Sequence, residues 1–317
     1  LIGPPNKGLN CMFTFMNTAR IGTAIQGLTA AELAFQGGLS YAKDRLAMRA
    51  LSGAKFPDLP ADPIIVHPAV RNMVLTCKAF AEGGRALVYY LSQFADVVAK
   101  GDGEAAEYAD QMLSLLTPIA KAFLTETGYE AANHGVQVYG GHGFIREWGM
   151  EQNVRDTRIA CLYEGTTEIQ ALDLLGRKVL GSQGKLLRNF TKVIHKFCQE
   201  HADNDEMGQF IRPLQRLNKE WGDITTRVGM EAMQNHDVVG GAAVDYMYYS
   251  GYVTLAYLWA RMAAVAQAAL QTDTTERAFY QAKIKTAQFY FAKLLPRTLT
   301  YAKRIETGLE PYMAMDV

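Results

Sequence analysis

The chain has 317 residues, of which 49% are hydrophobic and 20% are charged, and its 32 basic side chains balance its 32 acidic ones. Zero formal net charge excludes the strong positive charge with which many proteins bind nucleic acid or an anionic membrane surface. A chain of this length exceeds one typical domain and can bury a substantial core without disulfide or metal support. The composition therefore indicates a globular protein of two units, and we expect no nucleic-acid partner.

The cysteines and the apolar runs argue against a metal site and a membrane span. No Cys-x-x-Cys pair occurs among the four cysteines, which lie far apart in the sequence at Cys11, Cys77, Cys161 and Cys198, so we expect no metal. A membrane helix needs ~20 uninterrupted apolar residues, but the most apolar region, Tyr252 to Leu270, carries Arg261 in its middle. We expect no membrane span and a cytoplasmic location with reduced thiols. Because the chain opens at Leu1 without an initiator methionine or a signal-peptide region, we also expect it to be a piece of a longer protein.

Proline placement leaves room for long helices. Four of the ten prolines crowd into residues 57–68, and long proline-free segments lie on either side of them. Two sets of apolar residues recur at helical spacing, and each predicts one long amphipathic helix. They are Ile21, Ile25, Leu28, Phe35, Leu39 and Leu46 in the first set, and Val70, Val74, Cys77, Phe80, Leu87, Leu91 and Val98 in the second.

More helices are predicted along the rest of the chain. A third should begin near Asp102 as its N-cap and bend at Pro118. The pattern then predicts helices around 150–160, 166–180, 184–202, 207–235, 240–271 and 274–307. Asp273 and Glu276 resemble a capping box at the start of the last one.

Strand signals are nearly absent from the sequence. They are confined to Ile64–Val66 and to the opening segment before Asn10. We therefore predict an all-α fold, in which a helical bundle is followed by a second helical unit, with a boundary near Gly181–Gly184.

One glycine-rich region interrupts this helical pattern. Gly140, Gly141 and Gly143 could let the backbone approach a ligand closely. A helix that ends at Tyr139 and is closed by a glycine cap would explain the same residues.

Glu164, in the sequence Tyr163-Glu164-Gly165-Thr166, leaves two interpretations open as well. A carboxylate just before a helix is favoured by the helix dipole, and most such glutamates do only that. Alternatively, Tyr163 could form an apolar wall and Gly165 an open approach, so that desolvation raises the pKa of the Glu164 carboxyl toward that of a general base.

Two stretches of this sequence resemble the FAD-dependent acyl-CoA dehydrogenases. The run from Gln137 to Lys178, QVYGGHGFIREWGMEQNVRDTRIACLYEGTTEIQALDLLGRK, resembles their C-terminal helical domain. Residues 3–9 (GPPNKGL) and 16–20 (MNTAR) resemble the passage from the family's middle β domain into that helical domain. Residues 182–317, with VDY at 244–246 and WARMA at 259–263, resemble the extra helical domain of a bacterial subgroup that includes 3-methylmercaptopropionyl-CoA dehydrogenases.

The resemblance implies three parts of the chain and one reaction. Residues 1–14 would be the tail of a middle β domain, 15–181 the C-terminal helical bundle, and 182–317 the appended helical domain. Glu164 would remove the α-proton of an acyl-CoA thioester while the flavin accepts the β-hydrogen as hydride, which gives a trans-2-enoyl-CoA. Its N–H would help bind the thioester oxygen. Some family members place the base immediately before the arginine of the first helix, where this chain has Ala19, which cannot accept a proton.

The resemblance also implies the substrate contacts and the partners. Asn17, Arg20, Tyr163 and Gly165 would lie beside the substrate. An arginine such as Arg20 on an apolar helix can equally be a structural ion-pair partner. The implied partners are acyl-CoA, electron-transfer flavoprotein as the electron acceptor, and further copies of the chain in a homodimer or homotetramer.

The implied FAD contacts divide between two subunits. Arg45 would meet the FAD pyrophosphate of a neighbouring chain, and Gln137, Gly140 and Gly141 would lie under its adenosine part. Thr166 and Glu168 would lie near the FAD of their own subunit. Met48 and Arg49 depart from the phenylalanine and glycine that the family usually has there.

Two alternatives to a dehydrogenase remain open at this stage. One is an acyl-CoA oxidase relative, in which oxygen reoxidises the flavin. The other is an inactive helical assembly module, because the family's N-terminal helical domain and most of its β domain are absent from the sequence. The chain alone is then expected to lack FAD.

Overall fold

The chain folds almost entirely into helices. The computed structural model describes residues 3–12 and 15–316, and within these ranges it contains no β-strand. The first half comprises α1 (Gly8–Met12), α2 (Met16–Asp44), the 3₁₀ turn η1 (Ile64–Val66), α3 (Pro68–Lys100), α4 (Gly103–Tyr139), α5 (Gly141–Phe144), η2 (Arg146–Trp148), α6 (Met150–Ala160), α7 (Thr167–Leu172) and the π-helical η3 (Asp173–Leu180). The second half comprises α8 (Lys185–Glu200), α9 (Gly208–Ala232), α10 (Asp237–Leu270), α11 (Arg277–Phe289), the π-helical η4 (Tyr290–Leu294), α12 (Arg297–Thr307) and α13 (Glu310–Met313). The predicted all-α fold class is confirmed.

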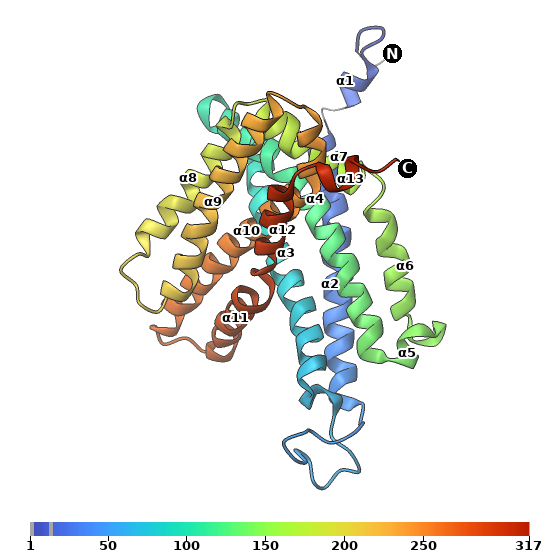
Figure 1. The fold of residues 1–317 in the computed structure, drawn as a ribbon. Coiled ribbons are helices and arrows are strands. Elements are labelled where there is room, and N and C mark those ends of the chain that lie inside the picture. The colour runs from blue at the N-terminus through green and yellow to red at the C-terminus, as the bar shows by residue number, and fades with distance from the viewer. Residues whose placement is uncertain (1–2, 13–14, 317) are drawn as a thin grey trace.

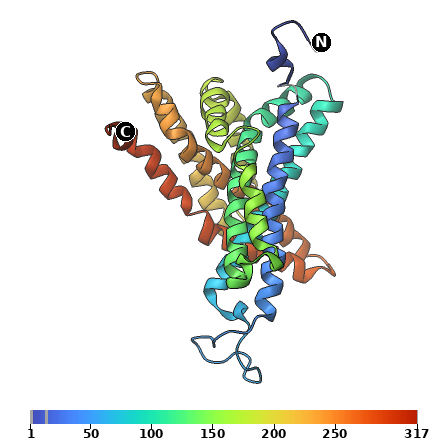
Figure 2. The same cartoon turned by 90° about the vertical axis from the view of Figure 1, so that its right-hand side faces the viewer.

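Three long helices, α2, α3 and α4, form the first bundle and run side by side in both views of Figures 1 and 2. The backbones of α2 and α4 approach closely where Gly27 faces Gly128. A Cβ at Gly27 would overlap the Leu124 carbonyl, and a Cβ at Gly128 would overlap the Gly27 carbonyl. Glycine is therefore required at both positions, since any side chain would push the two helices apart.

Neither of the two strand signals in the sequence corresponds to a strand in the described residues. Residues Ile64–Val66 form a 3₁₀ turn. Pro63 and Pro68 flank them, and no neighbouring segment pairs with them as a strand, since the nearest pairing is the single antiparallel bridge between Leu46 and Pro63. The opening segment contains the start of α1 instead of a strand. Residues 1–2 and 13–14 of the predicted 1–14 segment lie outside the described residues.

Two details of the predicted apolar stripe also differ. Leu46 lies beyond the end of α2, in the bridge that opens the loop to Pro63. Ile25 is 41% exposed because α3 and α4 cover the other face of α2.

The predicted helix 274–307 is divided. Pro296 has no N–H to donate, and the chain passes from the π-helical η4 through a turn into α12 at this point. The predicted capping box is wrong as well. The helix begins at Arg277, and Thr274 Oγ1 accepts from the N–H of Glu276 in place of an Asp273 cap.

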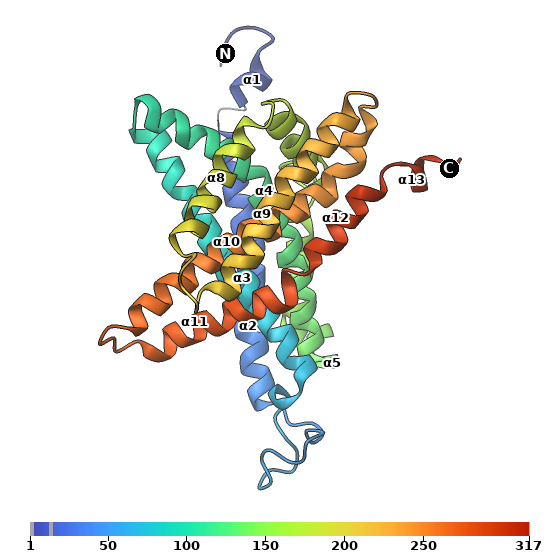
Figure 3. The same ribbon diagram turned by 60° about the vertical axis from the view of Figure 1, so that its left-hand side comes forward.

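Helix α10 is the central element of the second half. By length and composition alone it is the one helix among the described residues that could cross a membrane. Its apolar side chains are instead largely buried against the helices of both halves. In Figure 3, α9 and α12 run obliquely to the long axis of the first bundle, with α10 between them and it. Packing inside the protein therefore accounts for the apolar character of α10.

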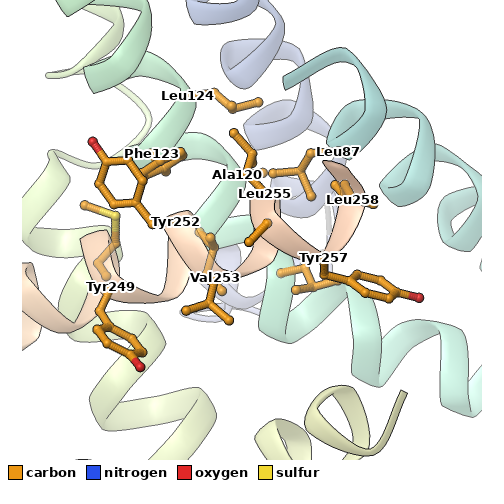
Figure 4. Close-up of a cluster of buried hydrophobic side chains, with 14 of the residues drawn as sticks. Leu87, Ala120, Phe123, Leu124, Tyr249, Tyr252, Val253, Leu255, Tyr257 and Leu258 are labelled. Carbon is orange, nitrogen blue, oxygen red and sulfur yellow. The ribbon is translucent and has the colours of Figure 1, made fainter. Parts of the chain in front are cut away.

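One continuous core joins the two halves. Figure 4 shows Phe123 and Leu124 of α4 and Leu87 of α3 packed against Tyr252 and other residues of α10. The chain turns at residues 181–184, at the predicted boundary, but the buried core does not stop there. The division into residues 15–181 and 182–317 stays a prediction, and the two parts share their interior.

Candidate active site

The sequence Tyr163–Thr166 forms a tight turn that joins α6 to α7. The N–H of Tyr163 still donates into the last turn of α6. Glu164 and Gly165 then both adopt positive φ, +58° and +90°, in the left-handed region that only glycine adopts readily. Thr166 is the N-cap of α7, since its Oγ1 accepts from the N–H of Ile169 at 3.4 Å. Glu164 is thereby placed in the middle of a sharp reversal of the chain.

Two buried side chains hold the carbonyl groups of this turn. The Nζ of Lys121, on α4, donates to the carbonyl oxygen of Gly165 at 2.6 Å. The Nε2 of Gln170, on α7, donates to the carbonyl oxygen of Glu164 at 2.8 Å. Neither donor side chain is exposed. The turn is therefore fixed from the inside, while the Glu164 residue itself is only partly buried.

The carboxylate and the N–H of Glu164 have no hydrogen-bond partner in the described residues. Within residues 3–12 and 15–316 the carboxylate makes no ion pair either. Tyr163 is 38% exposed, so the predicted apolar wall is open to solvent in this chain. The carboxylate can accept a proton from a bound molecule, and the N–H can donate a hydrogen bond to one.

Arg20 lies near this turn in a buried ion pair. Its Nη1 donates to Asp173 Oδ2 at 2.8 Å, and both side chains are at least 92% buried. Its Nε is buried without a partner in the described structure. This contact is the structural ion pair that the sequence left as an alternative. Asn17 lies one turn earlier on α2 and is half-buried, and a substrate contact by either residue stays a prediction.

The other predicted contacts lie at the opposite end of the bundle. Helix α4 ends at Tyr139, and Gly140 caps it with a φ of +60°, which is the glycine-cap interpretation. Gly140, Gln137 and Gly141 are exposed around this cap. A ligand can therefore reach the backbone here even though the glycine already has a structural role.

An aromatic-walled hollow lies beside this cap. The rings of Tyr41 and Tyr139 stack with centroids 4.1 Å apart, and His142 stacks on Trp148 at 4.8 Å. The hollow is lined by Ser40, Tyr41, Asp44, Arg45, Tyr139, His142 and Trp148. Arg45 is exposed and makes no ion pair within the described chain. An unpaired guanidinium beside stacked rings fits a phosphate joined to an aromatic base.

The predicted FAD contacts thus fall into two separate groups. Thr166 and the exposed Glu168 lie at the α7 end of the bundle, whereas Arg45 follows the last residue of α2 at the α5 end (Figure 1). The turn contacts α4 at Lys121, and α4 rises about 27 Å from Lys121 to Tyr139. The two groups of one chain therefore lie well apart along the bundle.

Sequence reasoning missed Lys121 and Gln170, which hold the turn, and Asp173, which pairs with Arg20. The partners of Lys121 and Asp173 lie 44 and 153 positions away along the chain, so no local spacing reveals those two contacts. One signal was present. Lys121 is the only charged residue in the apolar run from Leu115 to Leu124, and a buried lysine needs a partner.

Comparison with known proteins identifies two family regions. Residues 6–180 match the family described as "Acyl-CoA dehydrogenase, C-terminal domain", and residues 190–316 match "Acetyl-CoA dehydrogenase C-terminal like". The interval between the two matches contains the turn at residues 181–184.

Two curated relatives cover nearly the whole chain. The 3-methylmercaptopropionyl-CoA dehydrogenase of Ruegeria pomeroyi is 37% identical over 97% of this chain and 52% of its own length. The broad-specificity linear acyl-CoA dehydrogenase FadE5 of Mycobacterium tuberculosis is 31% identical over 100% of this chain and 53% of its own. The chain therefore spans about half the length of the curated relatives that it matches.

A solved structure shows the same fold. Caenorhabditis elegans ACDH-11, solved in complex with C11-CoA, aligns over 96% of this chain and 48% of its own with a TM-score of 0.76 at 17% identity. Together with the family match over residues 6–180, these comparisons show that the chain belongs to the acyl-CoA dehydrogenase family.

Proposed function

We propose that the chain is the C-terminal portion of an FAD-dependent acyl-CoA dehydrogenase and that Glu164 is the base that removes the α-proton of the acyl-CoA thioester. The observation that carries this proposal is the turn at Glu164. Its carbonyls are bound to buried donors, while its carboxylate and its N–H have no partner in the described structure.

The two free groups of Glu164 suit the two needs of this reaction. An α-C–H bond beside a thioester is too weak an acid for a carboxylate unless the negative charge that develops on the thioester oxygen is stabilised. The Glu164 N–H would donate to that oxygen while the carboxylate accepts the proton. Tyr163 and Gly165 flank these groups, and Asn17 and Arg20 would lie farther along the substrate.

FAD, when bound, supplies the acceptor for the β-hydrogen, which leaves as hydride. Arg45 would neutralise the pyrophosphate, and Gln137, Gly140 and Gly141 would support the adenosine part, on a neighbouring subunit. Thr166 and Glu168 would contact the FAD of their own subunit. The separation of the two groups along the bundle supports a homodimer or homotetramer. Electron-transfer flavoprotein as the acceptor and a cytoplasmic location in a bacterium complete the proposal.

The direct test is anaerobic reduction of the full-length, FAD-containing protein by a panel of acyl-CoA thioesters, including 3-methylmercaptopropionyl-CoA. We expect bleaching of the flavin absorbance and formation of one trans-2-enoyl-CoA per flavin, identified by mass. Reoxidation by a dye without hydrogen peroxide indicates a dehydrogenase, whereas peroxide formed at the rate of turnover indicates an oxidase. A protein that binds FAD but is reduced by none of the thioesters would contradict the proposal.

A further inference from the structure

The buried lysine of α4 has no evident role in the stability of the fold. Lys121 is fully buried, and within the described ranges it forms no ion pair, since its single hydrogen bond is to the Gly165 carbonyl at 2.6 Å. Burial lowers the pKa of Lys121 to about 8. A methionine could fill the same space without a buried charge. The position therefore carries a charged donor at a cost in stability that packing does not require.

The turn at Glu164 and Gly165, which the Lys121 side chain contacts, has an unfavourable backbone conformation that other contacts must stabilise. Glu164 is one of the few residues other than glycine with a positive φ in the described chain, and a side chain in that region is unfavourable by itself. If Glu164 returned to negative φ, its Cα–Cβ bond would point in another direction. Lys121 and Gln170 bind two consecutive carbonyls, of Gly165 and Glu164, and so oppose that change.

Because the peptide bond is planar, the hydrogen bonds to the two carbonyls also fix the directions of the N–H groups in the same peptide units. In a trans peptide the N–H points away from the carbonyl oxygen of the same unit. Because the Glu164 and Gly165 carbonyls point at buried donors, the N–H groups of Gly165 and Thr166 point away from them, and neither donates to a protein acceptor in the described chain. The two side chains thus fix the orientation of the two peptide units that follow Glu164.

From this geometry we infer that Lys121 is a positioning residue, which acts through its hydrogen bond to Gly165 to hold the Glu164 carboxylate in the direction needed for proton removal. The inference rests on the proposed function of Glu164. Lys121 does not act on the substrate itself, because its side chain is buried beneath the turn. Gln170 supports the same turn from α7 through the Glu164 carbonyl.

The experiment uses the full-length, FAD-containing protein and measures anaerobic flavin reduction at several concentrations of a reactive acyl-CoA. Lys121→Met removes the donor and retains the length of the side chain. We expect the limiting rate of reduction to fall about 10- to 100-fold, because small misplacements of a reacting group carry losses of that size. The apparent Kd for acyl-CoA should change less than about threefold. The midpoint of thermal unfolding should stay within a few degrees, because loss of the hydrogen bond is offset by loss of the buried charge.

A matched control separates positioning from a general effect of losing a lysine. Lys283, on α11, forms an ion pair with Glu82 at 2.8 Å and is 81% buried. Lys283→Met should reduce the flavin at the parent's rate. Gln170→Leu releases the neighbouring carbonyl of the turn and should slow reduction as Lys121→Met does. It provides the same test if the Lys121 variant does not fold.

A double variant tells failure of this inference from failure of the proposed function. If Lys121 acts through Glu164, the Met substitution should slow reduction in the parent but not in a Glu164→Gln background. Equal slowing in both backgrounds, or a Lys121→Met enzyme as fast as the parent, would overturn the positioning role. Parent-like reduction by Glu164→Gln alone would overturn the proposed function instead.

Discussion

Replacing Gly165 by alanine should destabilise the chain by about 2–5 kcal/mol, in two separable parts. The backbone part arises because Gly165 has a φ of +90°, where an L-residue costs about 1–2 kcal/mol. The contact part arises because the new Cβ would lie 2.5 Å from Nε2 of Gln170. That amide would lose its bond to the Glu164 carbonyl, and its Oε1 already has no partner. A buried polar group left without a partner costs about 1–3 kcal/mol.

Urea unfolding of Gly165→Ala, compared with the same substitution at a second glycine of similar φ, separates the backbone cost from the contact cost. Gly53 has a similar φ of +97°, and a Cβ there meets nothing within 4 Å. Gly53→Ala should therefore show the backbone cost alone, about 1–2 kcal/mol. Gln170→Ala should cost less in the Gly165→Ala background than in the parent, because the bond is already broken there. If Gly165→Ala cost no more than Gly53→Ala, the account of how Gln170 holds the turn would be wrong.

Three further predictions concern acid stability, the cofactor and the assembly. Burial by itself would raise the pKa of Glu130, but hydrogen bonds from His134 and Arg297 hold it at about 2. This stabilisation is present above pH 4.5 and is lost as the pH falls toward 2. The urea midpoint of Glu130→Gln should therefore approach the parent's as the pH falls over that range. A difference between the two midpoints that does not change with pH would contradict the assignment. Arg45→Ala in the full-length protein should lose FAD on dilution without losing helical circular dichroism, because a charge-assisted phosphate contact is removed, and full flavin occupancy after dilution would refute that contact. The 317-residue chain alone should form colourless dimers or tetramers, since its bundle can bury its own apolar faces but would contact only part of an FAD molecule. Light scattering and a visible absorbance spectrum test this, and a monomer or a yellow protein would contradict it.

The long helices could be predicted from the sequence because their signals are local. The apolar period and the absence of proline predict α2 and α3, and the glycines after Tyr139 predict the end of α4. The break at Pro296 lies inside one continuous helical pattern, so the predicted helix ran through it. The β-branched Ile64–Val66 read locally as a strand, but prolines on both sides and the lack of a partner strand leave it as a turn.

The candidate site could be predicted only in part. The resemblance leads to Glu164 because that motif is short and contiguous. The residues that fix its direction, Lys121 and Gln170, make contacts that depend on how α4, α7 and the turn pack together. Arg20 shows the same limit, since its buried partner Asp173 lies 153 residues away along the chain.

The role of Glu164 as the base is tested most directly by Glu164→Gln in the full-length, FAD-containing protein. Glutamine keeps the size of the side chain and the N–H of the turn but cannot take the α-proton. We predict that acyl-CoA still binds with a Kd within a few-fold of the parent's, and that anaerobic flavin reduction slows about 100-fold or more. Glu231→Gln, which makes the same change at an exposed position of α9, should reduce the flavin at nearly the parent's rate. Reduction of the Glu164→Gln enzyme at the parent's rate would contradict the account.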